Sequence, residues 1–176
     1  MSAYHDQEWG VPVHDDRALF EKLMLDAFQA GLSWRVILHK RDAFQEAFSG
    51  FELEVVAAYG PEDVERLMRN QGIVRNRAKI EAAVVNAQAS LAIQESEGSL
   101  DEFLWSFTGG DTIKGLKVES WQDKPTQSAE SRAMSTALRE RSFKFVGPTV
   151  CYAFMQAVGM IDDHLSTCFK YSGSDR

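Results

Sequence analysis

The stretch from residue 141 to residue 164 places cations, a glycine and a proline where they could bind phosphate. Gly147 permits a tight turn, and Pro148 suits the first position of a helix. The free backbone N–H groups at such a helix start attract anions, and Lys144 adds a full positive charge just upstream. These residues fit a phosphate contact, although a buried helix hairpin without any ligand explains them equally well.

A second group of residues has the chemistry of metal ligands. His164 and Cys168 lie four positions apart, which on a helix places both side chains on one face. Both residue types bind zinc. The spacing indicates a candidate metal site, with ordinary packing or surface positions as the alternative.

The charge of the chain restricts how it could meet nucleic acid. A formal net charge of −7 argues against a surface that is basic all round, so any such contact must be local. Residues 66–79 and residues 132–144 are both rich in Lys and Arg, and each stretch borders a glycine turn. One such stretch is usually a solvated helix face, but two of them favour phosphate contacts.

Length and composition predict one compact domain over residues 1–176, with 44% hydrophobic residues to build its core. Two cysteines, Cys151 and Cys168, are too few for a disulfide framework, and the N-terminus lacks the pattern of a signal segment. No apolar run reaches the roughly 18 residues that a membrane helix needs. We therefore expect a cytoplasmic protein without membrane contact.

The elements that must position these groups are helices. Apolar residues at helical spacing, together with start and stop signals, predict helices over residues 16–29, 34–48, 77–94, 100–107 and 131–140, with further helices starting at Pro61 and Pro148. Residues 109–131 are rich in glycine and polar side chains and predict a long connection. The predicted fold class is all-α, built from short helices joined by tight turns.

Six blocks of sequence, in order and spanning nearly the whole chain, resemble the DNA-3-methyladenine glycosylase I family. They are YHDQEWGVP (4–12), QAGLSW (29–34), GIVRNRAKI (72–80), WSF (105–107), FKFVGPTVCYAFMQA (143–157) and DHLSTC (163–168). The resemblance implies a two-lobed helical domain with a helix-hairpin-helix element and an active-site cleft between the lobes. It also implies that a monomer excises 3-methyladenine from alkylated double-stranded DNA, releases the free base and needs no cofactor for the chemistry.

The resemblance assigns the base pocket to the first three dozen residues. Adenine methylated at N3 is positively charged, so aromatic rings suit it, and Tyr4, Trp9 and Trp34 are the candidates. Core positions are the usual alternative for such rings. The adenine-binding glutamate of the family aligns with Asp26, whose carboxylate ends on the order of 1 Å further back. Asp26 is a candidate active-site carboxylate, with a solvent-facing position as the alternative.

The resemblance also places the 141–164 segment on the DNA backbone, with Lys144, Gly147 and Thr149 as the contacts. The hairpin of the superfamily often has two glycines, and Phe145 stands at the first. Lyase activity is not expected, because bifunctional members use a lysine in the hairpin and Lys144 precedes the turn.

Asp162 is the second candidate catalytic residue. It resembles the aspartate that stabilises the sugar cation or orients water in related glycosylases. A helix N-cap is the structural alternative.

The family ties its two termini with a structural zinc held by two histidines and two cysteines. His5, His164 and Cys168 match three of those positions. The fourth, a cysteine upstream of Tyr4, has no counterpart, because the sequence begins at Met1. Three ligands and a water would form an open site, which is weaker than a closed one.

The function predicted from these residues is that of a monofunctional DNA glycosylase. The first alternative is a non-catalytic module of the same fold that binds DNA or alkylated bases. The second is a metal-dependent hydrolase centred on His5, His164 and Cys168, which would lose its activity on chelation.

Overall fold

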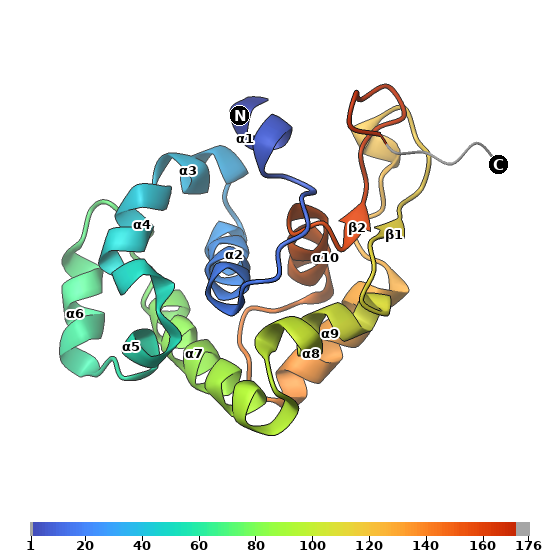
Figure 1. Ribbon diagram of the computed structural model, residues 1–176. Helices are drawn as coiled ribbons and strands as arrows, with labels where there is room; N and C mark the ends of the chain where they lie inside the picture. Colours follow the sequence, from blue (N-terminus) through green and yellow to red (C-terminus); the bar gives the residue numbers. More distant parts are fainter. Residues whose placement is uncertain (1, 172–176) are drawn as a thin grey trace.

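Short helices joined by tight turns make up most of the protein, in a computed structural model that describes residues 2–171 (Figure 1). The α-helices are α1 (Ser2–Gln7), α2 (Asp16–Gln29), α3 (Trp34–His39), α4 (Arg41–Ala47), α5 (Leu53–Ala57), α6 (Pro61–Arg69), α7 (Arg77–Glu97), α8 (Leu100–Trp105), α9 (Ala129–Glu140) and α10 (Pro148–Ala157). Short 3-10 helices are η1 (Ser49–Phe51), η2 (Ser106–Thr108) and η3 (Trp121–Asp123). The strands β1 (Ile113–Lys114) and β2 (Ile161–Asp162) form one parallel pair. The predicted all-α class is confirmed.

Helix α2 is the central element of the fold. It begins after Asp15, whose side-chain oxygen accepts a hydrogen bond from the backbone N–H of Ala18 at 2.8 Å. Between Leu19 and Phe28 the helix is buried nearly all round, as expected for a helix enclosed by others. Figure 1 shows α3 to α7 gathered on one side of α2 and α8 to α10 on the other. These two groups correspond to the two expected lobes.

Aromatic rings fill the core of the lobe that contains α4. The ring centroids of Phe28 and Phe44 lie 4.8 Å apart, and those of Phe48 and Phe51 stack at 5.3 Å. These four side chains are among the largest that are fully buried. Because ring pairs at such distances favour particular orientations, they fix how α2 meets α4 and η1.

Tertiary contacts adjust the predicted helix boundaries. The predicted helix over residues 34–48 is interrupted at Lys40, which separates α3 from α4. The Lys40 ammonium donates hydrogen bonds to the carbonyls of Gln71 and Gly72, at 3.0 Å in both cases. Helix α7 also runs past its predicted end, to Glu97. None of the helices within residues 2–171 is long and apolar enough to span a lipid bilayer.

The turn between α9 and α10 is tight, but its glycine is not the residue that bends it. Ser142 and Phe145 have φ values of 70° and 57°, whereas Gly147 has φ −64° and ψ 161° and is the N-cap of α10. The expected turn-forming role of Gly147 is therefore wrong, and Phe145 takes the left-handed conformation that glycine adopts most readily.

The buried side chain of Asn86 in α7 is hydrogen-bonded to the backbone of this turn. Its oxygen accepts the Lys144 N–H at 2.7 Å, and its amide donates to the Lys144 carbonyl at 3.0 Å.

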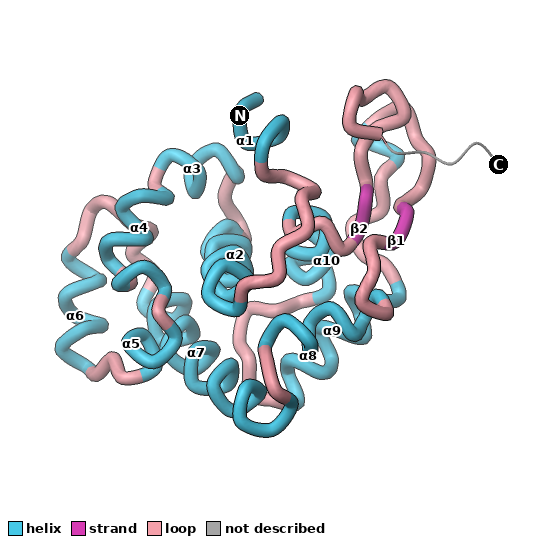
Figure 2. The backbone as a smooth tube through the Cα atoms, in the orientation of Figure 1, coloured by secondary structure: helices cyan, strands magenta, loops and turns pink. Residues whose placement is uncertain are grey.

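The segment that follows α1 packs against the end of α10 (Figure 2). The backbone N–H groups of Gly10 and Val13 donate hydrogen bonds to carbonyls at the C-terminal end of α10, both at 3.2 Å. Gly159 has φ 77°, and a Cβ atom there would lie 2.6 Å from the backbone nitrogen of Pro12. The approach of the two backbones therefore requires glycine at position 159.

Candidate functional site

A pocket of about 350 Å³ lies where the N-terminal segment, α2 and α10 meet. It falls between the two groups of helices, where the cleft is expected, and its size is that of a small-molecule site. The lining residues are Tyr4, His5, Trp9, Lys22, Asp26, Gln29, Trp34, Trp121, Ala153, Gln156 and Ala157. Residues far apart in the sequence thus share one concave surface, and the three predicted aromatic residues are among them.

Tyr4 and Trp34 form an aromatic wall of the pocket. Their ring centroids lie 5.5 Å apart, with the planes tilted by 45°. Both rings line the pocket, so neither occupies the alternative position in the closed core. The Trp34 indole N–H is buried without a hydrogen-bond partner. Burial, with Asp26 nearby, raises the pKa of Tyr4, so its hydroxyl remains neutral and can donate a hydrogen bond.

Asp26 is buried beside this wall, with 4% of its surface exposed, which excludes the solvent-facing alternative. Lys22, one helical turn earlier in α2, donates a hydrogen bond to Asp26 Oδ1 at 3.0 Å. The other carboxylate oxygen, Oδ2, is buried with no partner. Burial raises the pKa of Asp26 and lowers that of Lys22, and the attraction between the two opposes both shifts. Because buried polar atoms normally have partners, Oδ2 is an available acceptor for a ligand N–H.

Trp9 lines the pocket and contacts a cluster of metal-ligand residue types. Its ring centroid lies 4.7 Å from that of His164 and 5.9 Å from that of His5. The exposed ring of Trp121 meets Trp9 edge to face at 5.8 Å between centroids. Trp9 therefore lines the pocket and also packs against the two histidines.

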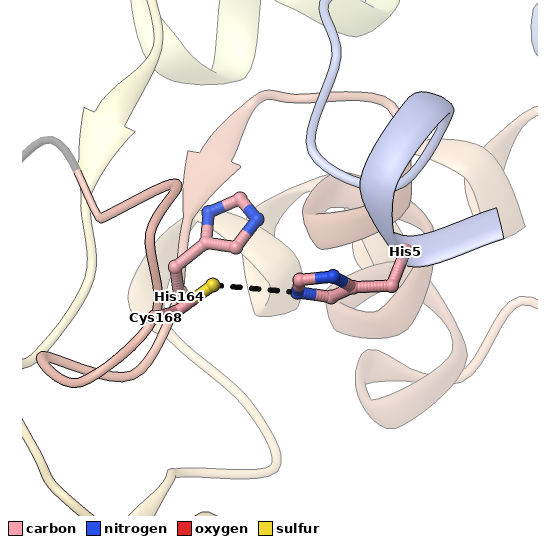
Figure 3. Close-up of side chains that lie close together, drawn as sticks. All are labelled: His5, His164 and Cys168. Carbon is pink, nitrogen blue, oxygen red and sulfur yellow. Dashed lines mark hydrogen bonds between the residues drawn. The ribbon is translucent and has the colours of Figure 1, made fainter. Parts of the chain in front are cut away.

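His5, His164 and Cys168 converge on one point, and their ligand atoms all lie within 4.8 Å of one another (Figure 3). Cys168 Sγ lies 3.5 Å from His5 Nε2, and His164 Nε2 is buried with no hydrogen-bond partner. The expected shared helical face is wrong, because His164 and Cys168 lie in the irregular segment after β2. A turn in that segment brings the two side chains together instead.

The chemistry of this cluster fits zinc. Nδ1 of His5 donates to Asp6 Oδ1 and Nδ1 of His164 donates to Asp162 Oδ1, both at 2.8 Å. A histidine held by a carboxylate through one nitrogen presents the other nitrogen to a metal, which is the usual arrangement around protein-bound zinc. The described residues supply three ligands to this centre.

Asp162 does not line this pocket. Its carboxylate accepts hydrogen bonds from His164 Nδ1 and, at 3.3 Å, from the Lys114 ammonium. It lies in β2, so it is not the N-cap of a helix. The neighbouring Asp163 is fully buried, and its carboxylate accepts hydrogen bonds from Tyr152 at 2.8 Å and from Lys124 at 2.7 Å.

The hairpin residues lie at the N-terminal end of α10, ahead of the part of the helix that lines the pocket. Lys144 and Thr149 are exposed on either side of Gly147, the helix N-cap. Ala153, Gln156 and Ala157 of α10 line the pocket, so the pocket begins roughly 8 Å along the helix from Pro148. One rigid helix thus sets the spacing between the exposed turn and the pocket.

Two cations of the basic stretch 66–79 are bonded to other parts of the protein. The Lys79 ammonium donates to the carbonyls of Phe28 and Ala30, at 2.9 Å and 2.6 Å, and so satisfies the C-terminal end of α2. Arg77 pairs with Glu65 at 2.7 Å. The phosphate contact expected of residues 66–79 is therefore not available from these two side chains.

Sequence reasoning missed six residues of the pocket, which are Lys22, Gln29, Trp121, Ala153, Gln156 and Ala157. Lys22 could have been found, because it precedes Asp26 by four positions in a predicted helix and so lies on the same face. Trp121 and Gln156 carried no such signal. Their positions depend on how the 109–128 connection and α10 fold back onto the N-terminal segment.

Comparison with known proteins gives one consistent result. The family described as methyladenine glycosylase matches residues 1–171. The DNA-3-methyladenine glycosylase of Haemophilus influenzae is 44% identical over 165 residues, which are 94% of this chain and 89% of that protein. A crystal structure of 3-methyladenine DNA glycosylase I has a TM-score of 0.93 at 46% identity, covering 97% of this chain and 93% of that one. A tyrosine-to-phenylalanine variant of such an enzyme, solved in complex with 3-methyladenine, has a TM-score of 0.91 at 41% identity, covering 95% and 89%.

Proposed function

The chain belongs to the methyladenine glycosylase family, and we propose that it hydrolyses the N-glycosidic bond of 3-methyladenine in DNA while the base occupies the pocket between α2 and α10. It is a monofunctional DNA glycosylase of base-excision repair, with alkylated DNA as substrate and the free base as product. The observation that carries the proposal is Asp26 Oδ2, a buried acceptor without a partner beside the Tyr4 and Trp34 rings.

The chemistry requires recognition more than acid catalysis. N3-methylated adenine in DNA is a cation and a good leaving group, so the C1′–N9 bond breaks with its electron pair leaving on the base. The base departs neutral, and water adds to the sugar carbon and loses a proton. Tyr4 and Trp34 contact the faces and edge of the flipped base, Asp26 Oδ2 accepts from its exocyclic amine, and Trp9 closes the far side.

The hairpin formed by α9 and α10 is the proposed helix-hairpin-helix contact with the DNA backbone. Lys144 and Thr149 are exposed there, and Gly147 leaves the start of α10 without a side chain in front of it. Such a contact positions the duplex and carries no sequence information. The spacing along α10 then lets one nucleotide swing into the pocket while the backbone stays on the hairpin.

His5, His164 and Cys168 are the residues that would hold zinc, and the ion would supply structural closure of the two chain ends. Asp162 is proposed as the residue that positions His164, in place of a catalytic role, because its hydrogen bond fixes that ring. No step of base release involves this centre.

The protein is further proposed to be a single domain that acts as a cytoplasmic monomer. One contiguous cluster of buried residues runs from Leu19 to Ile161, which supports one domain. The free thiols of Cys151 and Cys168 favour a reducing compartment. Size-exclusion chromatography with light scattering tests the monomer.

The test is release of 3-methyladenine from methylated duplex DNA, measured by chromatography of the freed bases. Trp34→Ala should lower the rate by at least tenfold, because it removes the stacking surface. Val55→Ala, an exposed apolar position on α5, is the matched control and should keep the wild-type rate. Salt-dependent DNA binding without base release by the wild type would instead select the non-catalytic binding module.

A further inference from the structure

Lys22 lines the pocket, but the proposed recognition of the base by aromatic rings and Asp26 gives it no role. Its ammonium lies 3.7 Å from the centroid of the Trp34 ring and 5.8 Å from that of Tyr4. The same nitrogen donates to Asp26 Oδ1 at 3.0 Å. The side chain is largely buried, with 15% exposed. A protein cation therefore already lies against the aromatic ring that a cationic base would use.

Lys22 also cancels the charge of the recognition carboxylate. Whether the proton resides on Lys22 or on Asp26, the pair has no net charge. Two other acids of this region have cationic partners of their own, because Glu8 and Glu21 both pair with Arg41 and Glu21 also pairs with Arg17. The negative charge that would attract a cationic base is thus neutralised inside the pocket, while Asp26 Oδ2 keeps its capacity to accept a hydrogen bond.

We propose that Lys22 is a specificity-determining residue that removes the preference of the base pocket for positively charged purines, so that bases are selected by shape, stacking and hydrogen bonding. The inference rests on the proposed function, because it assumes that the pocket holds the base. It extends the class of ligands to neutral alkylated purines with an exocyclic amine. Such ligands meet no penalty from the Lys22 charge, whereas a cation loses most of its attraction to Asp26 and to the Trp34 ring.

The experiment compares two ligands of nearly the same shape by titrating tryptophan fluorescence. The 3,9-dimethyladeninium ion has a fixed positive charge, and 9-methyladenine is neutral. The proteins are the full-length wild type, Lys22→Met, which removes both the charge and the hydrogen bond, and Lys22→Gln, which removes the charge but can still donate to Asp26. Lys117→Met, an exposed position outside the pocket, is the matched control. Burial raises the pKa of Asp26 and Lys22 opposes that rise, so every protein is titrated over a range of pH from neutral to alkaline and the ratios are compared where they no longer change with pH.

In both Lys22 variants the affinity for the cation relative to the neutral ligand should rise at least about tenfold over wild type, because the unit charge 3.7 Å from the Trp34 ring centroid has been removed. The extra methyl group contributes to the ratio in every protein, so comparison between proteins isolates the charge. Lys117→Met should leave the ratio unchanged.

An unchanged ratio in Lys22→Gln, with both ligands bound, would overturn the inference and leave the proposed function standing. A rise in Lys22→Met alone would also overturn it, because the hydrogen bond to Asp26 and not the charge would then set the preference. If neither ligand bound to the wild type or to any variant, the pocket would not be a base site, and the proposed function would fail together with the inference. Circular dichroism establishes that each variant is folded, and Lys22→Gln carries the test if Lys22→Met is not.

Discussion

Lengthening the side chain of Asp26 by one methylene group should change the rate of base release. The free oxygen of Asp26 is buried in the pocket, but the side chain is one methylene shorter than the glutamate that the family resemblance implies at this position. Asp26→Glu should increase the rate of 3-methyladenine release several-fold, since it moves the acceptor about 1 Å towards the base and hydrogen bonds require a separation near 2.9 Å. The rate of base release under single-turnover conditions measures this effect.

Asp42→Glu, the same change at an exposed position in the first turn of α4, is the control for Asp26→Glu and should leave the rate unchanged. A loss of activity in Asp26→Glu would mean that the pocket is already adjusted to aspartate. Lys22 would be part of that adjustment, because its ammonium donates a hydrogen bond to the other oxygen of Asp26.

Individual residues differ in how well the sequence predicted them. Tyr4, Trp9, Trp34 and Asp26 were predicted for the pocket from the family resemblance, and the structure places all four of them in its lining. Asp162 was expected to be catalytic, but its carboxylate contacts His164 instead. The direction of a side chain in an irregular segment depends on contacts across the fold, which local patterns do not contain.

Among the elements, the turn before α10 offers a test that separates stability from DNA binding. Gly147 has an ordinary backbone conformation, and a Cβ there would meet nothing closer than a side-chain nitrogen of Arg139 at 3.5 Å. Gly147→Ala should therefore leave the protein as stable as the wild type or more stable by about 0.4–1 kcal/mol, through loss of freedom in the unfolded chain. It should weaken binding to duplex DNA several-fold, because the new methyl group lies where a phosphate approaches the helix start.

Gly60→Ala is the matched control for Gly147→Ala. Gly60 is also an N-cap followed by proline, with open space around it, but it lies at α6 in the other lobe. Thermal melts and fluorescence anisotropy with labelled duplex measure the two quantities. Equal DNA affinity for both alanine variants would remove the start of α10 from the DNA interface.

Asp163 links three parts of the structure through one buried carboxylate. It accepts hydrogen bonds from Tyr152 and Gln156 of α10 and from Lys124, which is itself nearly buried. Asp163→Asn should lower the free energy of unfolding by about 3–5 kcal/mol, because it leaves the Lys124 charge buried without its partner. Urea denaturation measures the change.

Tyr152→Phe is the graded comparison for Asp163→Asn. It removes one hydrogen bond to the same carboxylate and leaves the ion pair intact, so the expected loss is about 1.5–3 kcal/mol, the range for a bond to a charged group. If both variants lowered the free energy of unfolding by the same small amount, the Lys124 ammonium would be solvated, and its ion pair with Asp163 would not stabilise the fold.

Helix starts and stops were largely readable from the sequence, whereas breaks within helices were not. The N-terminal boundaries of α2, α6 and α10 follow from an acidic N-cap and from prolines at the first position. The break at Lys40 depends on a hydrogen bond to residues about thirty positions away, which only the folded chain brings near. The strands β1 and β2 have two residues each and are too short to leave a pattern in the sequence.

At the scale of the whole molecule, the two ends of the described chain meet at the histidine–cysteine cluster. The Lys170 ammonium donates to the carbonyls of His5 and Trp9, at 3.0 Å and 3.2 Å, beside the contact between His5 and Cys168. The contact between the two ends of the chain was predicted only from the family resemblance. No local property of these residues requires that the first and last segments come together.

Thiol alkylation followed by mass spectrometry tests this closure. In the zinc-loaded protein neither cysteine should react, because Cys168 would be a ligand and Cys151 is fully buried. A chelator should expose Cys168, while Cys151 should stay unreactive in the folded protein, since burial raises its pKa to about 12. Cys151 is therefore an internal control for unfolding, and elemental analysis should find about one zinc per chain.

His164→Ala is the matched variant for the alkylation experiment. It should leave Cys168 reactive even with zinc added, because only His5 and Cys168 would remain of the three ligands. Equal labelling of Cys168 in the wild type with and without zinc would contradict the metal assignment.

Helix α1 buries none of its residues completely, yet it carries both Tyr4 and His5 on consecutive positions. Because Tyr4 and His5 are neighbours on one short helix, the contacts between His5 and the C-terminal segment also help to fix the ring of Tyr4 at the pocket. Loss of those contacts should therefore change how readily the pocket binds and releases a base.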